Sequence, residues 1–459
     1  MKIMPVSDSP WAPTGFGTNT RNIASIFADE GHQIGYAGCQ NTKHEPSWET
    51  PWPLGQEEKK VSMELLPMMY PGQEKFGEKS FPQWLQSFQP DLVFTHLDIQ
   101  MFSYMTEAKT PTGVNLPFLS EDGARPLNFQ EFQKLCKQGW REGKKERFKI
   151  GSIIPIDGQP SIPAWQQTLE HVDYPVAMSQ YGKTVMGMDF MDWNPKNPIT
   201  YIPHGVDCDF FKPQKIAKPN PDTFVVGCVA RNQHRKNIPR LMRSFKLFVE
   251  KNNLTPDDAK LMLHMDWADH MGWNIEYMAS PYIYDIADYL MPPTMGSLEG
   301  GQHPDDMGMV NIYNLMDVHA LPTGGEGFGI PTVEAMACGT PNVICNYTTS
   351  YEIVGADKPE CPEDMLLPHG TEGDDNLIES DRGFLVPYKD LMWDTPIRAA
   401  PLRALWDEHK AAEAFEYYYH NRDVLKEHSE NARKYALKHY DWKQAVGPMW
   451  KKWINQVSI

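Results

Sequence analysis

The sequence has few cysteines, and they form no recognisable pattern. Seven cysteines occur in 459 residues, an odd number without a C-x-x-C pair, so we expect free thiols rather than disulfides or a zinc cage. Long apolar runs are also missing, and none reaches the length that a bilayer-spanning helix needs. The chain starts MKIMPVSDSPW, with Pro5 and Asp8 where a signal peptide would be apolar. We therefore expect a cytoplasmic protein.

Positive charge is scarce as well. The 43 Lys and Arg residues against 60 Asp and Glu give a formal net charge of −17, which argues against a nucleic-acid partner, because neutralising phosphates needs a basic surface. The exception is KLCKQGWREGKKERFK, Lys134–Lys149. Such a run is typical of a solvated helical face. Alternatively, it contacts a negatively charged acceptor or an anionic membrane, which would place the protein peripherally at the inner membrane face.

What the chain does have is a globular composition, with 41% hydrophobic and 22% charged residues. Its length exceeds one ordinary core, so we expect two domains. Apolar runs at Ile3–Val6 and Ile34–Ala37 flank a loop with Gly15 and Gly17 and a helical pattern that ends near Gly31, which predicts a βαβ opening. Because strand and helix patterns alternate along the chain, we expect an α/β fold with parallel sheets covered by helices.

A domain boundary is indicated where proline density rises, between Asn194 and Pro221, before a new strand pattern at Thr223–Ala230. The limits that we predict are 1–205 for a first Rossmann-like domain, 206–222 for a linker, 223–438 for a second Rossmann-like domain and 439–459 for a C-terminal helix. In the second half, we expect helices at Ile238–Glu250 and Thr332–Cys338 and strands at Lys260–His264, Val318–Pro322 and Asn342–Cys345.

The segment GGEGFGIPTVEAMACGTP contains a predicted helix start. Pro331 suits the first helical position because its missing N–H has no partner there in any case. Gly327 and Gly329 leave the preceding backbone open to close approach, and free N–H groups at the positive end of a helix predict a phosphate site. Glu334 then falls in the first turn, where a carboxylate is favourable in its own right. Glu326 lies before the helix and has no such explanation.

Several polar or glycine residues directly follow predicted strands. Ligands of open α/β sheets bind beyond the carboxyl ends of the strands, so two sheets that face each other would bring these residues to one cleft. The residues are Gly15, Gly17, His96, Asp157, Arg231 and Glu326.

GEGFGIPTVEAMACGTP resembles the glutamate–seven–glutamate motif of family-4 glycosyltransferases. Five further segments resemble that family in the same order: PTGFGTNTRNIASIFADEGHQIGYAG, HVDYPVAMSQYGKTVM, YIPHGVDCDFF, VGCVARNQHRKNIPRLMRSF and NIYNLMDVHALPT. The resemblance implies the GT-B fold, in which two Rossmann-like domains face each other across a cleft and a C-terminal helix returns to the first domain. It also implies metal-independent, retaining transfer of a sugar from a nucleoside diphosphate sugar to a hydroxyl of a glycan, a lipid or another acceptor, without a further cofactor.

The same resemblance implies roles for single residues. Glu334 would bind the ribose hydroxyls of the donor, and Arg231 with Lys236 would neutralise the diphosphate as it leaves. Glu326 would lie at the donor sugar, and Asp157 stands where many relatives have a histidine near the reacting sugar. The backbone positions assigned to the donor are Gly15, Gly17, Gly327, Phe328, Gly329 and Ile330.

Other interpretations of these residues remain open. Asp157 precedes a glycine, and Asp-Gly is a strong turn signal. Arg231 and Lys236 could be surface charges of a basic turn, and His96 could be a partly buried loop histidine with a satisfied hydrogen bond. The sequence around Cys208, DCD, spells a metal-binding pattern of another glycosyltransferase fold, and HMDWADH, His264–His270, imitates a metal cluster, but we predict no metal site.

Two other functions fit the same architecture. A sugar-nucleotide epimerase would convert the donor without an acceptor. A non-catalytic protein would bind the sugar nucleotide and transfer nothing, although Glu326 and Arg231 are both present.

Overall fold

The computed structural model covers the whole chain and describes most of it. Residues outside the described part are 13, 40–46, 52–59, 69–76, 78–79, 110–147, 163–164, 191–192, 194, 196, 217, 219, 293–305, 363–365, 367–375, 395–400 and 459. Nearly all of the basic segment Lys134–Lys149 lies outside the described residues. Its final residue, Lys149, pairs with Asp173 at 3.4 Å.

The first half of the molecule is built on one sheet with the strand order β3-β4-β2-β1-β5-β6-β7-β8. Neighbouring strands are parallel, apart from the antiparallel pair β3 and β4. Its elements are β1 (Lys2–Asp8), α1 (Gly15–Asp29), β2 (Gln33–Cys39), β3 (Ser47–Pro51), β4 (Lys60–Met68), α2 (Ser80–Phe88), β5 (Leu92–His96), α3 (Ile99–Lys109), β6 (Lys149–Ile154), α5 (Trp165–Leu169), β7 (Tyr174–Ala177), α6 (Gln180–Asp189) and β8 (Thr200–Tyr201).

The second half has its own sheet, in the order β10-β9-β11-β12-β14-β13, and a separate hairpin of β15 and β16. All pairs of the sheet are parallel except β13 with β14. The strands are β9 (Phe224–Val229), β10 (Ala259–His264), β11 (Val318–Leu321), β12 (Asn342–Cys345), β13 (Ile378–Ser380), β14 (Gly383–Val386), β15 (Tyr388–Trp393) and β16 (Leu402–Trp406).

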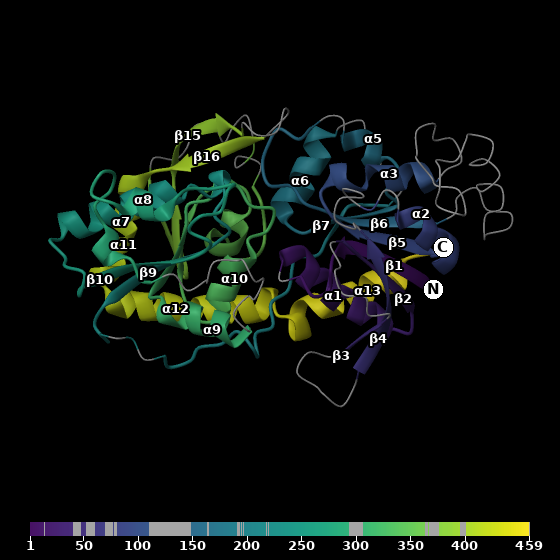
Figure 1. The fold of residues 1–459 in the computed structure, drawn as a ribbon, viewed down its shortest axis with the longest axis horizontal. Coiled ribbons are helices and arrows are strands. Elements are labelled where there is room, and N and C mark those ends of the chain that lie inside the picture. Colours follow the sequence, from purple (N-terminus) through teal and green to yellow (C-terminus); the bar gives the residue numbers. More distant parts are fainter. Residues whose placement is uncertain are drawn as a thin grey trace.

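The helices of the second half and of the C-terminus cover this sheet and reach beyond it (Figure 1). They are η1 (His234–Lys236), α7 (Ile238–Lys251), α8 (Ile275–Ala279), η2 (Ala287–Tyr289), α9 (Asp306–Leu315), α10 (Ile330–Ala337), η3 (Tyr351–Gly355), α11 (Glu408–His420), α12 (Arg422–His439), η6 (Trp442–Val446) and α13 (Gly447–Gln456).

The apolar runs become strands because both faces of the sheets are covered. All six residues of β9 are buried, as are the five interior residues of β1. Such continuous apolar strands are typical of parallel sheets with helices on both sides. The predicted α/β fold with parallel sheets is therefore confirmed, and the predicted βαβ opening corresponds to β1, α1 and β2.

The C-terminal helix returns to the first half, as predicted. The chain breaks after α12 at Tyr440, and α13 then packs on α1 (Figure 1). The ring of Trp453 lies 5.9 Å from that of Phe27 and 5.5 Å from that of Phe94, and Lys451 pairs with Asp29 at 3.2 Å. Buried aromatic area, rather than the exposed ion pair, holds this helix.

The two segments that cross between the halves are hydrogen-bonded to each other. The N–H of Val206 donates to Tyr440 at 2.8 Å, and the N–H of Trp442 donates to Val206 at 3.1 Å. A Cβ atom on Gly205 would lie 2.4 Å from the indole of Trp442, so only glycine fits. Two parallel chain segments thus run side by side where the chain crosses between the halves.

Two further expectations concern composition. The cysteines of the described part are free thiols, as expected, and five of the six are buried. Among the described helices, none is long and apolar enough to cross a membrane.

Candidate active site

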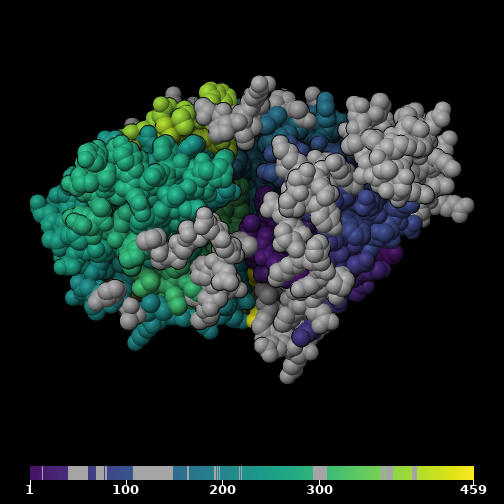
Figure 2. Space-filling view, in the orientation of Figure 1, coloured from purple at the N-terminus to yellow at the C-terminus, as the bar shows by residue number. Residues whose placement is uncertain are grey.

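Loops from the two halves meet at the carboxyl ends of their sheets, as the positions of these loops predicted. A Cβ atom on Gly325 would lie 2.1 Å from the carbonyl oxygen of Asp157, and one on Gly15 would lie 2.8 Å from Cδ1 of Ile330. Close backbone approach therefore requires glycine at position 325, whereas Gly15 faces the end of a flexible side chain. Figure 2 shows a furrow between the two halves, with part of the N-terminal segment (purple) at its bottom.

The turn before α10 has the geometry of an anion site. Gly329 has a positive φ of 97° and precedes Ile330, the first residue of the helix, which has proline in its first turn. No hydrogen bond joins the N–H groups of residues 327–330 to another described residue. Free N–H groups at a helix start attract anions. We call residues 327–330 the N–H turn.

The buried side chain of Phe328 fixes the N–H turn to the protein interior. Its side chain is 3% exposed, and its ring lies 5.5 Å from that of Tyr440 and 5.2 Å from that of His204. Its carbonyl accepts a hydrogen bond from the hydroxyl of Thr349 at 2.9 Å. Because the ring and the carbonyl are both held, the backbone N–H of Phe328 is the group that remains for a ligand.

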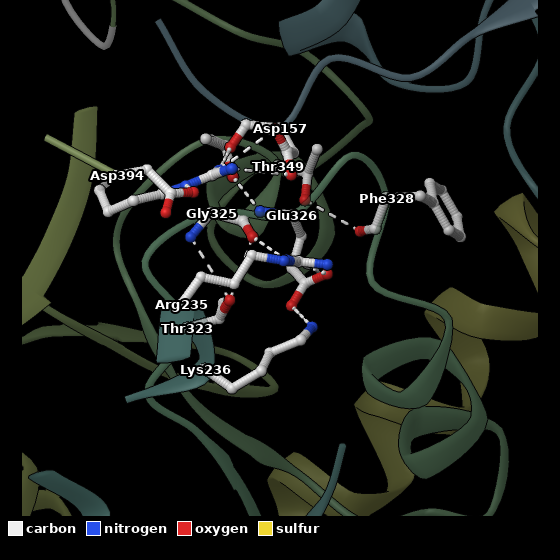
Figure 3. A network of polar contacts seen from close by, with 11 residues as sticks. Asp157, Arg235, Lys236, Thr323, Gly325, Glu326, Phe328, Thr349 and Asp394 are labelled. Carbon is white, nitrogen blue, oxygen red and sulfur yellow. Dashed lines mark hydrogen bonds and ion pairs between the residues drawn. The ribbon is translucent and has the colours of Figure 1, made fainter. Parts of the chain in front are cut away.

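Glu326 is buried between two cations (Figure 3). Lys236 donates a hydrogen bond to its Oε1, and the guanidinium of Arg235 lies 3.6 Å from its Oε2. Burial alone would raise the pKa of Glu326, but Lys236 and Arg235 outweigh it and lower that pKa to about 2. Burial and Arg235 lower the pKa of Lys236, which the Glu326 carboxylate opposes. Glu326 is therefore an anion at neutral pH.

The basic pair differs in part from the prediction. Lys236 lies at Glu326, but Arg231 is largely exposed and its Nε donates to Asp269 at 3.0 Å. Arg235 is the second cation at Glu326 and also donates to the carbonyl of Gly325 at 2.7 Å. The role of Arg231 at a diphosphate stays a prediction.

Glu334 does not lie in the first turn of its helix, and this expectation was wrong. The helix α10 begins at Ile330, earlier than expected, and its first turn contains no acidic residue. The helix starts earlier because Gly329, with its positive φ, turns the chain directly before Ile330. Glu334 instead accepts a hydrogen bond from the phenol of Tyr313 at 2.7 Å. The helix dipole therefore does not account for this carboxylate.

The two glycines that were predicted in a loop, Gly15 and Gly17, instead lie in the first turn of α1, which begins at Gly15 after the cap residue Thr14. Thr14 accepts a hydrogen bond from the N–H of Gly17 at 3.0 Å and donates to Asp8 at 2.6 Å. A Cβ atom on Gly17 would lie 2.7 Å from the carbonyl of Ala12. Gly17 thus shapes the start of α1, whereas Gly15 faces Ile330 of the second half.

Three carboxyl groups lie at or just beyond the carboxyl ends of strands of the first half: Asp8 ends β1, Asp98 follows β5 and Asp157 follows β6. Burial raises the pKa of Asp98 to about 6, and the charges of Asp157 and Asp8 add to this while Arg235 opposes it. Sequence reasoning missed Asp98, although it lies only two residues after His96, the last residue of β5. A carboxyl group that titrates near neutral pH is suited to accept a proton.

Asp157 is bound by an arginine of the second half. Nη1 of Arg403 donates to the carbonyl of Asp157 at 2.6 Å, and Nη2 donates to its carboxylate at 3.2 Å. Arg403 lies on β16, and sequence reasoning missed it because its partner is 246 residues away along the chain. Asp157 is thus more than a turn residue.

Other candidate residues have structural explanations. His96 is the last residue of β5 and is fully buried, so the expected partly buried loop position was wrong, whereas the expected hydrogen bond is present, with Nδ1 2.9 Å from the hydroxyl of Thr20. Asp207 accepts hydrogen bonds from the N–H groups of Asp209 and Phe210 at 3.0 and 3.1 Å, so it caps a turn. Within the described ranges, no group of three His, Cys, Asp or Glu residues could hold a metal ion.

Sequence comparison connects part of the chain to glycosyltransferases. Residues 301–361 match the model "Glycosyl transferases group 1". The chain is 30% identical over 141 residues to the capsular polysaccharide biosynthesis glycosyltransferase CapM of Staphylococcus aureus, which covers 31% of this chain and 33% of CapM. It is 24% identical over 216 residues to the lipopolysaccharide core biosynthesis mannosyltransferase LpsB of Rhizobium meliloti, covering 45% of this chain and 55% of LpsB. The chain thus spans between a third and about half of these relatives.

Structural comparison extends over the whole chain. Sucrose-phosphate synthase from Thermosynechococcus elongatus superposes with a TM-score of 0.64 at 16% identity, covering 99% of this chain and 98% of the other. WaaG, a glycosyltransferase involved in lipopolysaccharide biosynthesis, superposes with a TM-score of 0.54 at 12% identity and covers both chains completely. At such low identity the likeness shows the fold alone. The chain has the GT-B fold, as the sequence resemblance implied.

Proposed function

We propose that this chain is a retaining, metal-independent family-4 glycosyltransferase that moves a sugar from a nucleoside diphosphate sugar to an acceptor hydroxyl. The observation that carries the proposal is the N–H turn, which has unbonded donors and lies between Glu326 and Glu334. A diphosphate suits such a helix start. The match of residues 301–361 to glycosyl transferases group 1 includes this turn and supports the same class.

The donor would lie along α10. Its diphosphate binds the N–H turn, and its ribose hydroxyls donate to Glu334, whose carboxylate Tyr313 already holds in place. A carboxylate can accept from two neighbouring hydroxyls. Lys236 and Arg235 lie close to the turn, and Arg231 would leave Asp269 to reach the outer phosphate. Fixed cations at the leaving group lower the barrier to its departure.

The reaction that we propose needs no covalent intermediate. The acceptor oxygen attacks the anomeric carbon on the face of the departing diphosphate, the bond from that carbon to the phosphate oxygen breaks, and the acceptor proton moves to that oxygen. The configuration is therefore retained. Glu326, an anion at neutral pH, stabilises positive charge that develops on the sugar, and Asp157 accepts a hydrogen bond from a sugar or acceptor hydroxyl.

The acceptor would bind the first half, where Asp8, Asp98 and Asp157 present hydrogen-bond acceptors for a hydroxyl-bearing glycan, lipid or other compound. Contact with the inner face of a membrane through Lys134–Lys149, a cytoplasmic location, the absence of a cofactor and the domain limits 1–205, 206–222, 223–438 and 439–459 remain part of the proposal. Mannose is the first donor sugar to test, because LpsB is a mannosyltransferase.

Thermal-shift measurements with guanosine, uridine and adenosine diphosphate sugars test the proposal. A donor that binds the folded chain raises Tm by mass action. We expect one donor to raise Tm and to be consumed only when an acceptor is added. Consumption without an acceptor would favour the epimerase, and binding without consumption across an acceptor panel would favour the non-catalytic protein. No shift with any donor would contradict all three functions.

A further inference from the structure

The β15–β16 hairpin contacts the first half at the loop that follows β6. Leu402 donates its N–H to the carbonyl of Gln159 at 2.7 Å. A Cβ atom on Gly158 would lie 2.8 Å from Cβ of Pro401. We call these contacts, together with those of Arg403 to Asp157, the hairpin contact. Its residues are distinct from the crossing segments at Val206 and Trp442, so it is a further connection between the halves.

Arg403 is the centre of the hairpin contact. Its guanidinium is 6% exposed and binds two carboxylates, with Nε donating to Asp394 at 2.8 Å while Nη1 and Nη2 reach Asp157. Asp394 belongs to the hairpin and Asp157 to the first half. Because one planar guanidinium satisfies a carboxylate on each side, it fixes both the distance and the direction between them.

This contact continues to Glu326 (Figure 3). The carbonyl of Asp157 that Arg403 binds lies against Gly325, where a Cβ atom would be 2.1 Å from it and 2.9 Å from Nη1 of Arg403. The carbonyl of Gly325 in turn accepts from Arg235, which pairs with Glu326. Every step from the hairpin to Glu326 is thus a direct contact of buried or half-buried groups.

We propose that Arg403 is a positioning residue, which holds the Asp157 loop of the first half against the Glu326 loop of the second half. It thereby fixes the position of the acceptor-side carboxylate, Asp157, relative to the donor-side carboxylate, Glu326. The kinetic part of this inference rests on the proposed function, whereas the structural part does not. A displacement of catalytic groups by about 1 Å from the reacting atoms lowers turnover by about 100-fold.

Hydrogen exchange of the full chain, followed by mass spectrometry, tests the structural part. Arg403→Met should raise the exchange rate by about tenfold or more in peptides from residues 156–162 and also in peptides from residues 401–406. The reason is that a buried hydrogen bond to a charged group is lost. Arg240→Met is the matched control. Arg240 binds Glu408 and the carbonyl of Trp406, so its loss should leave exchange in 156–162 unchanged. Unchanged exchange in 156–162 of Arg403→Met would overturn the proposal.

Kinetics of the same variants test the positioning role. Arg403→Met should lower kcat by about 100-fold while the donor-induced Tm shift stays, and Arg403→Lys, which keeps the charge without the fork, should recover part of kcat. Equal kcat in Arg403→Met and wild type, or a loss of donor binding, would contradict positioning. If Arg403→Met does not fold, Arg403→Lys carries both measurements. If wild type transfers no sugar, the proposed function fails while the exchange result still decides the hairpin contact.

Discussion

Glu326 and Glu352 are buried glutamates of the second half, and their surroundings differ in one respect. Glu326 has Lys236 and Arg235 beside its carboxylate, and although burial opposes it, its pKa falls to about 2. Glu352 lies in η3, where its Oε2 accepts from the N–H of Tyr181 in the first half at 3.0 Å. Its Oε1 has no hydrogen-bond partner among the described residues. Burial raises the pKa of Glu352 to about 8, although backbone N–H groups lower it.

The difference shows that the counter-charges, rather than burial, decide whether a carboxyl group is ionised here. At neutral pH Glu326 is an anion next to the N–H turn, and Glu352 is a neutral acid at a contact between the halves. Only an ionised carboxylate such as that of Glu326 can stabilise positive charge that develops in a ligand. Four experiments, each comparing two proteins, test this comparison and the site around Glu326.

The largest effect is expected for Lys236→Met, which removes a counter-charge of Glu326. Breaking a buried ion pair by removing one partner costs about 3–5 kcal/mol of unfolding free energy, which urea denaturation measures. Lys246→Met is the control, because Lys246 forms a partly exposed pair with Glu250 at 3.4 Å and should cost less than about 1 kcal/mol. Similar small losses in both variants would mean that Glu326 does not depend on Lys236.

Glu326→Gln should be the largest catalytic effect. We expect kcat to fall by about 100- to 1,000-fold, as for a preorganised charged group at a reaction centre, while the donor-induced Tm shift is kept. Glu352→Gln should leave kcat near wild type, since Glu352 is already neutral. Steady-state kinetics at saturating donor compares the two, and equal turnover in both variants would break the distinction between them.

Glu334→Gln should weaken donor binding. Loss of a charged acceptor for the ribose hydroxyls should lower donor affinity by about tenfold or more, with kcat at saturating donor little changed. Tyr313→Phe removes only the phenol that holds Glu334, so a smaller loss is expected. Titration of donor by calorimetry measures both. Unchanged donor affinity in Glu334→Gln would mean that the ribose does not bind at Glu334.

The smallest effect concerns pH. The pKa of Glu352 is raised in the folded chain above its unfolded value, so its stabilising protonation is complete at low pH and is lost as pH rises through about 8. Wild-type Tm should therefore fall between pH 6 and 9, by roughly 2 °C or more beyond the fall in Glu352→Gln. Burial raises the pKa of the phenols of Tyr201, Tyr435 and Tyr440 above their ordinary range, so they do not ionise in this window. Parallel Tm curves of the two proteins would contradict the raised pKa.

Local patterns predicted much of this molecule. The strand at Asn342–Cys345 has the same limits in sequence and structure, because a buried parallel strand is a short apolar run between turn residues. Glycines at 327 and 329 predicted the open turn, because glycine is needed where backbones approach. These features depend on neighbours in sequence, which a single chain displays.

Contacts between distant residues could not be predicted. Arg403 binds Asp157, and Arg235 binds Gly325 across 90 residues, and neither arginine differs in sequence from an ordinary surface charge. The pKa of Asp98 is raised to about 6 because the side chain is buried and the carboxylates of Asp157 and Asp8 lie nearby. The sequence alone shows neither cause. The predicted domain limits stay a prediction. The two sheets and the segments that cross between the halves do not define the residue at which a linker begins or ends.

A crystal structure of the chain with a bound nucleoside diphosphate tests the central claim most directly. We predict diphosphate oxygens within hydrogen-bond distance of the N–H groups of residues 327–330, the ribose at Glu334, and Lys236 or Arg235 at the outer phosphate. A nucleotide bound elsewhere, with the N–H turn contacting only protein, would contradict it.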